Sequence, residues 1–288
     1  MFDVTGEGEV QVGQRTRIGR GAQIIFQSPA KVVLGDYCII GDGVKIVVSG
    51  GDVKIGDWTT LHDNCLVLSK TGVSIDEHCW FGQNCVIDGT GGIRIGRGVR
   101  VGMYSQLWSH VAAGERMEGC TLFAEREVDI HDDVWLVGTC IVASGVTLGR
   151  RLVALIGSNI TKSFPQDMVI AGVPAAPRPN LSFYEPVTDT QKADMLRGWL
   201  DEFAGSAGFD RQSGAGWECV SEPGGGAVYF ATNSAVAAQL RSGNPEATIC
   251  CIETKRYEKM FTDAEHKILK FLAGNKARFY SGAPRAPS

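Results

Sequence analysis

The chain has 288 residues, of which 44% are apolar and 21% are charged. This composition is typical of a globular protein with one or two domains, and it excludes a disordered or purely fibrous chain. Lys and Arg number 28 against 32 Asp and Glu, and a net charge of −4 gives no reason to expect a nucleic-acid partner. Gly is abundant, at 37 residues without a collagen period, and predicts many tight turns.

The N-terminal sequence MFDVTGEGEV lacks the basic start and apolar run of a signal peptide. No segment approaches the roughly 18 apolar residues of a membrane span. The nine Cys contain no Cys-x-x-Cys pair, so a zinc ribbon is unsupported. We therefore expect a cytoplasmic protein with reduced thiols and no membrane span.

An aliphatic or aromatic residue recurs every six positions through the first half of the chain. Five copies of this pattern begin at Leu34, Ile55, Ile75, Ile95 and Ile130. A period of six fits neither an amphipathic helix at 3.6 residues nor a plain strand at 2. It fits a short strand and a turn on one face of a prism, with three faces to a coil. Stacked coils would then bury ladders of like residues.

Small or apolar residues recur four positions after each aliphatic one, and several of them are Cys. The Cys in this column are Cys38, Cys65, Cys79, Cys85 and Cys140. Since free Cys behaves as a small hydrophobe in protein cores, we interpret these five as buried packing residues and not as metal or redox sites.

The repeat is interrupted once. An 18-residue coil that begins at Ile95 would restart at position 113, but the pattern restarts at Ile130 and leaves 17 residues extruded. Solenoids tolerate such insertions on one face, which is often the binding face. His110 lies at the mouth of this loop. From the residues alone it is either a general base, since its pKa is ordinarily near neutrality, or a surface residue.

The repeat ends before residue 181. We expect a helix over Thr190–Phe203, strands over Ala227–Thr232 and Ala247–Glu253, and a second helix from Thr262 to about Leu272. Asp210–Gly214 is interpreted as a flexible loop. These elements predict a small α/β domain over residues 181–288, and no motif indicates its role.

The hexads of residues 15–180 resemble the hexapeptide-repeat acyltransferase family. The resemblance implies a mainly-β fold, a left-handed parallel β-helix, which would make residues 1–180 a β-helix acyltransferase domain. In the galactoside, maltose and xenobiotic acetyltransferase branch, a coil that begins Ile-Gly-x-x-Val ends in a catalytic His just before an extended loop. Ile95–Val99 followed by Ser109-His110 matches this pattern, with Val111 where the branch often has Pro. The resemblance therefore implies that His110 is the catalytic base.

The segments after the loop resemble the coenzyme A stretch of the same family. They run Ile130–Gly138, Gly145–Gly149, Ile156–Lys162 and Ala171–Ala175, with Ala143-Ser144-Gly145 where Pro-Gly is common. The resemblance implies that Gly138, Ile156, Thr161 and Lys162 contact the cofactor, with Lys162 meeting a phosphate as a point charge.

Four further residues are weaker candidates. Arg178 could also meet a cofactor phosphate. Trp135 is either a ligand contact or a packed aromatic at a subunit edge. Asn84 and Asp88 fall near positions that hold acceptor hydroxyls in sugar acetyltransferases, although a solvated turn explains each of them as well.

Together these features predict a coenzyme A-dependent O- or N-acyltransferase with acetyl-CoA, or another acyl-CoA, as co-substrate and no metal. The family implies a sugar or nucleotide-sugar acceptor, a place in polysaccharide biosynthesis and a homotrimer. Since most of the Cys face inward, direct transfer is favoured over a covalent intermediate. A non-catalytic sugar-binding or scaffold solenoid remains an alternative. A γ-class carbonic anhydrase is disfavoured because it needs two His five residues apart, and none of the five His has that spacing.

Overall fold

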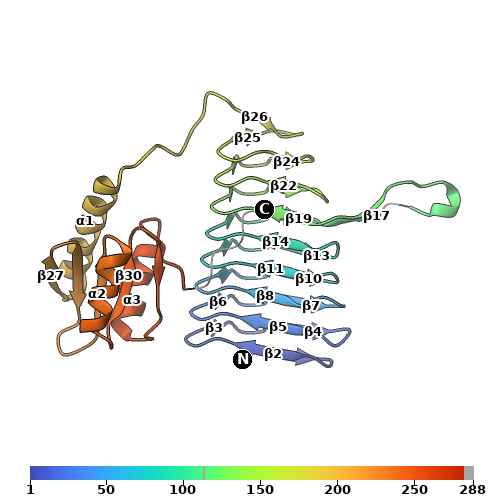
Figure 1. Ribbon diagram of the computed structural model, residues 1–288. Coiled ribbons are helices and arrows are strands. Elements are labelled where there is room, and N and C mark those ends of the chain that lie inside the picture. The colour runs from blue at the N-terminus through green and yellow to red at the C-terminus, as the bar shows by residue number, and fades with distance from the viewer. Residues whose placement is uncertain (113, 282–288) are drawn as a thin grey trace. The chain divides into compact units, whose positions relative to one another are not determined.

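The computed structural model describes residues 1–112 and 114–281 and divides into two compact units, one of them Met1–Tyr184 and the other beginning at Glu185. The first unit is a three-sided solenoid, in which each coil contributes one short strand to each of three sheets (Figure 1). The strands of each sheet pair in parallel along the stack, apart from an antiparallel final strand in the third sheet. The predicted mainly-β fold class, a parallel β-helix of hexapeptide repeats with a small α/β domain, is confirmed.

We name the three sheets faces A, B and C in the order in which each coil visits them. Face A consists of β1 (Asp3–Thr5), β4 (Gln23–Phe26), β7 (Lys45–Val48), β10 (Leu66–Ser69), β13 (Val86–Gly89), β16 (Gln106–Leu107), β21 (Ile141–Val142) and β24 (Asn159–Ile160). Face B consists of β2 (Glu9–Val12), β5 (Lys31–Leu34), β8 (Val53–Ile55), β11 (Val73–Ile75), β14 (Ile93–Ile95), β19 (Val128–Ile130) and β22 (Thr147–Leu148).

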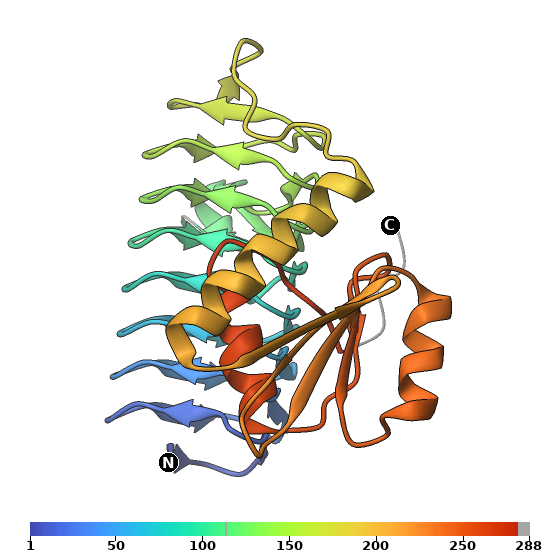
Figure 2. The same ribbon diagram turned by 90° about the vertical axis from the view of Figure 1, so that its left-hand side faces the viewer.

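Face C consists of β3 (Arg17–Ile18), β6 (Ile39–Ile40), β9 (Thr60–Leu61), β12 (Trp80–Phe81), β15 (Arg100–Val101), β20 (Trp135–Leu136), β23 (Val153–Ala154), β25 (Val169–Ala171) and β26 (Ala176–Pro177). Turns connect the faces at three edges, which we name by the faces they join. The coils stack in register along the solenoid axis (Figure 2). They begin at Asp3, earlier than the residue 15 at which the sequence resemblance starts.

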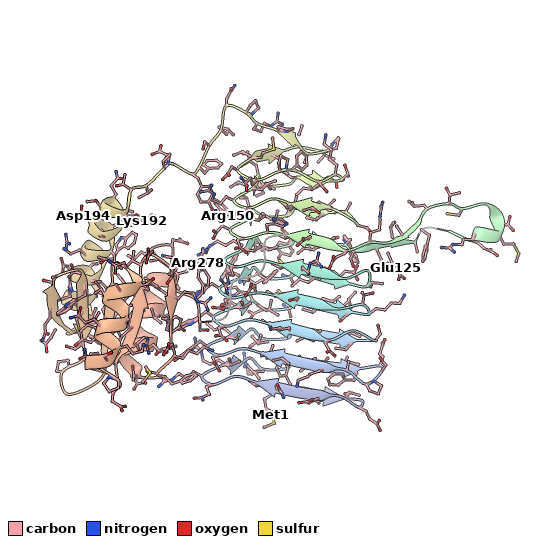
Figure 3. The ribbon with its side chains drawn as sticks, viewed as in Figure 1. Met1, Glu125, Arg150, Lys192, Asp194 and Arg278 are labelled. Carbon is pink, nitrogen blue, oxygen red and sulfur yellow. The ribbon has the colours of Figure 1, made fainter. Side chains whose placement is uncertain are left out.

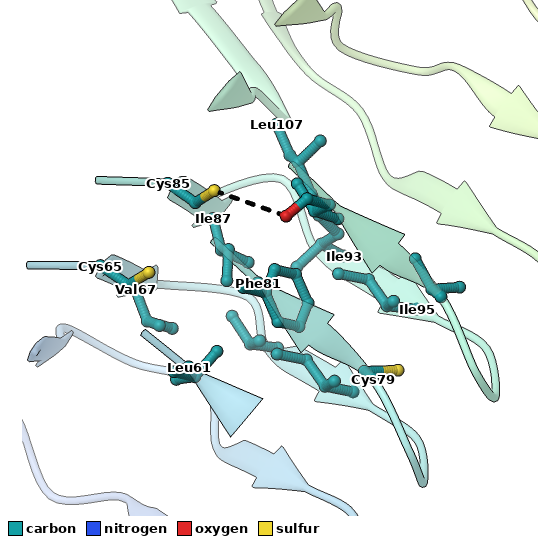
Figure 4. Close-up of a cluster of buried hydrophobic side chains, with 14 of the residues drawn as sticks. Leu61, Cys65, Val67, Cys79, Phe81, Cys85, Ile87, Ile93, Ile95 and Leu107 are labelled. Carbon is teal, nitrogen blue, oxygen red and sulfur yellow. Dashed lines mark hydrogen bonds between the residues drawn. The ribbon is translucent and has the colours of Figure 1, made fainter. Parts of the chain in front are cut away.

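The six-residue period is explained by ladders of buried side chains. On face A, Val67 pairs with Ile87 on the next coil, and Ile87 pairs with Leu107, and all three are fully buried. The five Cys of the repeat are also buried, as predicted. Figure 4 shows Cys65 and Cys85 on successive coils beside these aliphatic residues. Each residue of a ladder therefore packs on its equivalents in the neighbouring coils, which stabilises the stack.

Close stacking of the coils also explains why small residues follow the aliphatic ones. A Cβ atom placed on Gly102 would lie 2.0 Å from the carbonyl oxygen of Val137 on the next coil. No other residue fits there without moving the backbone.

The predicted extrusion lies on the A–B edge. After β16 the chain forms an antiparallel hairpin of β17 (His110–Ala112) and β18 (Phe123–Glu125), with a short 3-10 helix at Arg116–Glu118 between them. It then re-enters the solenoid at β19. Figure 1 shows this hairpin projecting from the stack of coils. Pairing of its two arms was not expected from the sequence, which predicted only a loop.

The second unit is a five-stranded sheet with three helices. Its elements are α1 (Asp189–Ala207), β27 (Asp210–Gly214), β28 (Trp217–Ser221), β29 (Ala227–Ala231), α2 (Ser234–Gly243), β30 (Thr248–Cys251), β31 (Arg256–Tyr257) and α3 (Asp263–Ala273). The helices α1 and α3 and the strands β29 and β30 lie where the sequence predicted them.

The prediction of a loop at Asp210–Gly214 was wrong. This segment is β27, because it pairs antiparallel with β28 across a tight turn. The helix α2 and the strands β28 and β31 were not predicted at all. Over the described residues 1–112 and 114–281, no helix combines the length and the apolarity that a membrane span requires.

Candidate active site

The backbone places His110 at the first position of the hairpin, where the chain leaves face A. Its side chain is 34% exposed, and its Nδ1 atom lies 2.8 Å from Oδ2 of Asp88. Asp88 belongs to β13 on the preceding coil, which pairs with the strand that leads into His110. The parallel register therefore brings together two residues that are 22 positions apart in the sequence.

Asp88 is fully buried, and both of its carboxylate oxygens are occupied. Oδ2 accepts hydrogen bonds from the backbone N–H and the hydroxyl of Ser109 (2.8 and 3.0 Å), in addition to the backbone and ring nitrogens of His110. Oδ1 accepts from the hydroxyl of Thr90 (2.5 Å) and from its backbone N–H (3.1 Å). A buried carboxylate requires such partners, because an unpaired one carries a large desolvation penalty.

These hydrogen bonds determine the charge of the group. Burial alone would raise the pKa of Asp88, but the hydrogen bonds from Thr90, His110 and Ser109 outweigh it and hold the pKa below its ordinary value. Asp88 is therefore ionised at neutral pH and can only accept. Its partner on the ring, Nδ1, then carries the hydrogen, and Nε2 of His110 keeps the lone pair.

The sequence placed Asp88 among acceptor-binding residues, and the structure buries this side chain. Its side chain has no exposed surface to offer an acceptor, and its carboxylate contacts the ring of His110 instead. Asn84 is half-buried and lies in the turn between β12 and β13, on the C–A edge. Face A therefore separates Asn84 from His110 within one chain.

The residues implied for cofactor binding fall on two edges of the solenoid. Thr161 and Lys162 follow β24 on the A–B edge, on the same edge as His110, and both are exposed. The ammonium group of Lys162 lies 5.5 Å from the ring centroid of Phe164. Gly138 and Ile156 instead lie in turns of the C–A edge.

The backbone of the C–A edge is open at these turns. Ile156 is 70% exposed, and a Cβ atom on Gly157 would meet nothing within 4 Å. Gly138 is nearly as open, since the nearest atom to such a Cβ would be the carbonyl oxygen of Met103 at 3.8 Å. A long, thin ligand arm can approach main-chain groups along such an edge.

The remaining two candidates lie elsewhere. Trp135 is 43% exposed on face C, between Arg100 and Val153 on adjacent coils. Arg178 is exposed after the last strand, and its guanidinium donates to the carbonyl oxygen of Ala171 (3.3 Å). Within residues 1–112 and 114–281, no group of three or more His, Cys, Asp or Glu side chains is placed to hold a metal ion.

Sequence reasoning missed the roles of Thr90 and Ser109. Their hydroxyl groups hold Asp88, and the hydroxyl of Ser109 also accepts from the backbone N–H of Gly91 (2.8 Å). The register of successive coils did contain a signal for the pairing of Asp88 with His110. A coil of 20 residues places Asp88 next to the segment that ends in His110, so the repeat spacing alone could have paired them.

Comparison with known proteins adds a sequence relative. The chain is 26% identical over 141 residues to a galactoside O-acetyltransferase of Lactococcus lactis subsp. lactis (strain IL1403), and the match covers 49% of this chain and 59% of the relative. The chain resembles the hexapeptide-repeat acetyltransferases. The match thus spans little more than half of the length of that relative, and no family model matches the chain.

Solved structures with a similar outline include two whose names describe their chemistry. One is the polysialic acid O-acetyltransferase OatWY, with 20% identity, a TM-score of 0.48 and coverage of 67% of this chain and 96% of that one. The other is a galactoside acetyltransferase in complex with coenzyme A, with 16% identity, a TM-score of 0.26 and coverage of 65% and 74%.

Proposed function

We propose that this chain is an acetyl-CoA-dependent acetyltransferase that modifies a hydroxyl or amine of a sugar, with His110 as the general base. The hydrogen-bonded pair of His110 and Asp88 at the mouth of the hairpin carries the proposal. It occupies the coil whose sequence matches the catalytic coil of the galactoside branch. The relative of known activity is itself named a galactoside O-acetyltransferase.

The geometry of the pair supports the chemistry that we assign to it. Bound acetyl-CoA supplies an acetyl group that is activated as a thioester. Nε2 of His110 accepts the proton of the acceptor hydroxyl or amine as that group bonds to the acetyl carbon. The imidazolium, stabilised by the carboxylate of Asp88, then returns the proton to the sulfur as the carbon–sulfur bond breaks. Asp88 touches neither substrate and is a positioning residue.

Backbone groups on the next coil are suited to hold the developing negative charge on the carbonyl oxygen. The turn Ser144-Gly145 lies on the A–B edge, and the hydroxyl of Ser144 donates to the carbonyl oxygen of Ser109 (2.9 Å). In the described part of the chain, the backbone N–H groups of Ser144 and Gly145 have no hydrogen-bond acceptor. Donors fixed in advance at such a position are the usual source of oxyanion stabilisation.

We further propose that the protein is a homotrimer with sites shared between neighbouring subunits. In one chain, His110 and Lys162 lie on the A–B edge, whereas Gly138 and Ile156 lie on the C–A edge. A cyclic assembly in which the A–B edge of one subunit meets the C–A edge of the next would bring both sets together.

Release of free thiol from acetyl-CoA against a panel of sugars and amines tests the activity. Wild type should release thiol only when a suitable acceptor is present, and His110→Ala should lower the rate by about 10²–10⁴-fold. His78→Ala is a matched control, since His78 lies on the B–C edge, outside both proposed halves of the site, and stacks on Trp58 at a ring-centroid distance of 5.9 Å. If His110→Ala keeps more than half of the wild-type turnover, His110 is not the base.

A further inference from the structure

Arg126 is held next to the proposed base by its backbone. It follows β18, and its N–H donates to the carbonyl oxygen of Ser109 (2.9 Å), the residue before His110. Ser144 on the next coil donates its hydroxyl to the carbonyl oxygens of Ser109 (2.9 Å) and Arg126 (3.4 Å). The position of Arg126 relative to the mouth of the hairpin is therefore fixed on two sides.

The charge of Arg126 is not compensated by its neighbours. Glu125 pairs with Lys70 (2.7 Å), and Glu127 pairs with Arg94 (2.7 Å). Figure 3 shows Glu125 at the base of the hairpin. Arg126 itself is exposed and forms no ion pair in the described part of the chain. The two flanking carboxylates are thus neutralised by cations of preceding coils, and the guanidinium of Arg126 remains available at the base of the hairpin, on the side of the coil that follows His110.

The side chain of Arg126 extends along the next coil. A Cβ atom on Gly145 would lie 3.2 Å from both Cβ and Nε of Arg126 and 3.3 Å from Cδ. The stem of Arg126 therefore lies over a glycine, and any larger residue there would displace it. In contrast, His110 contacts Asp88 on the preceding coil.

We infer that Arg126 recognises an anionic group of the acceptor, so that the natural acceptor is a sugar with a carboxylate or a phosphate. This inference rests on the proposed function. The acceptor hydroxyl must come within hydrogen-bond reach of His110, so the substituents of the same sugar ring come close to Arg126. A guanidinium binds carboxylate and phosphate groups through paired hydrogen bonds. The phosphates of acetyl-CoA are separated from its thioester by the whole pantetheine arm, so they lie away from a cation beside the base.

Two acceptors that differ only in charge provide the test. A hexuronate glycoside and its neutral hexuronamide carry the same hydroxyls, and a hexose phosphate separates phosphate from carboxylate recognition. Wild type should prefer the hexuronate or the hexose phosphate to the neutral sugar by about tenfold or more in kcat/KM. Arg126→Gln should abolish this preference through a higher KM for the anionic acceptor, and it should leave kcat/KM for the hexuronamide within about twofold. Arg126→Lys should retain part of the preference.

Arg116→Ala is the matched control, because Arg116 is an exposed arginine of the same hairpin whose guanidinium lies over the ring of Phe123, 4.1 Å from its centroid. It should leave both acceptors unaffected. If Arg126→Gln lowers kcat equally for both acceptors, Arg126 instead stabilises the carbonyl oxygen of the acetyl group or the packing of the hairpin. That result would overturn the inference. The inference would also be overturned if the wild-type enzyme did not discriminate between the charged and the neutral acceptor. It would be overturned as well if Arg126→Gln raised the KM for acetyl-CoA and this effect disappeared with a cofactor lacking the 3′-phosphate. A wild type that transfers acetyl to no acceptor would instead overturn the proposed function itself.

Discussion

The indole of Trp108 meets the imidazole of His110 edge to face, with the ring centroids 5.9 Å apart and the planes at 74°. Trp108 is itself held, since its indole N–H donates to the side-chain oxygen of Gln106 (3.0 Å). The imidazole therefore lies between an aromatic ring and the carboxylate of Asp88, and these two contacts limit its orientations. A base whose orientations are limited in this way loses less conformational entropy when the acceptor binds.

The first prediction concerns the substitution Asp88→Asn. An amide at this position can donate a hydrogen bond to Nδ1, which favours the tautomer with its hydrogen on Nε2 and removes the lone pair that accepts the acceptor proton. We expect kcat to fall by about 10²-fold or more, with little change in the KM for acetyl-CoA. Steady-state kinetics across pH would measure both. A variant that folds and keeps wild-type kcat would show that Asp88 is only structural.

The same carboxylate predicts how stability depends on pH. The pKa of Asp88 is lower in the folded protein than in the unfolded chain, so its ionisation contributes stability above its unfolded value of about 4. That contribution is lost as the pH falls through the lower, folded pKa. Denaturant unfolding of wild type and Asp88→Asn should therefore give a stability difference that is constant near neutrality and shrinks in acid. A difference that grows in acid would contradict the direction of the shift.

The reactivity of the thiols gives a third prediction. All nine Cys are free, and only Cys120, in the hairpin, is partly exposed. Among the buried ones, Cys38 has its pKa raised to about 12 by burial, so it is a neutral thiol at pH 8. A thiol reagent should therefore label about one Cys per chain in the native protein and all of them in denaturant. Cys120→Ser should remove the native reaction, and fast labelling of several Cys would contradict the packed core.

The sequence predicted the solenoid well because each coil repeats the same local rule. A buried aliphatic residue recurs every six positions, and equivalent positions of successive coils are occupied by Val67, Ile87 and Leu107. Because this pattern repeats over many hexads, it is a strong signal. Pairing of β17 with β18 follows no such repeat and depends on contacts between Val111 and Ala124 that a single sequence does not specify. The error at Asp210–Gly214 has the same origin, since its polar residues form a strand only because β28 provides the partner.

Some residues of the candidate site could likewise be predicted from the sequence, and others could not. His110 could be selected from its place before the extruded loop. The repeat spacing could have placed Asp88 near His110, but it could not show that the carboxylate is buried against the ring, because an aspartate at this position also suits a solvated carboxylate. Arg126 was one of seven charged residues among the 17 that interrupt the repeat. The sequence does not show that Glu125 and Glu127 form ion pairs with Lys70 and Arg94 of preceding coils while Arg126 forms none in the described part of the chain.

A fourth prediction concerns Lys162. It is exposed on the A–B edge, and we propose that it meets a cofactor phosphate. An exposed contact of this kind is screened by salt and contributes about 1 kcal/mol, or about fivefold in affinity. Lys162→Ala should raise the KM for acetyl-CoA several-fold and leave kcat close to wild type, because the phosphate is remote from the thioester. The effect should shrink with a cofactor that lacks the 3′-phosphate.

Lys54→Ala is the control for this experiment. Lys54 is exposed on face B, away from the A–B edge, so its removal should change neither constant. Equal losses with both cofactors in Lys162→Ala, or a large fall in kcat, would assign Lys162 another role.

The last prediction tests whether the site is shared between subunits. Sedimentation should give a species of three times the chain mass of 30.9 kDa at micromolar concentration. His110→Ala and Ile156→Asp alter the A–B and the C–A edge respectively, and each should be inactive alone. If each site joins the A–B edge of one subunit to the C–A edge of the next, trimers formed from an equal mixture should have about one quarter of their sites intact. Co-expressing the two variants and assaying the mixed trimer measures this. Mixed trimers without activity would show that each site lies within one chain, and a species of 30.9 kDa would exclude the assembly itself.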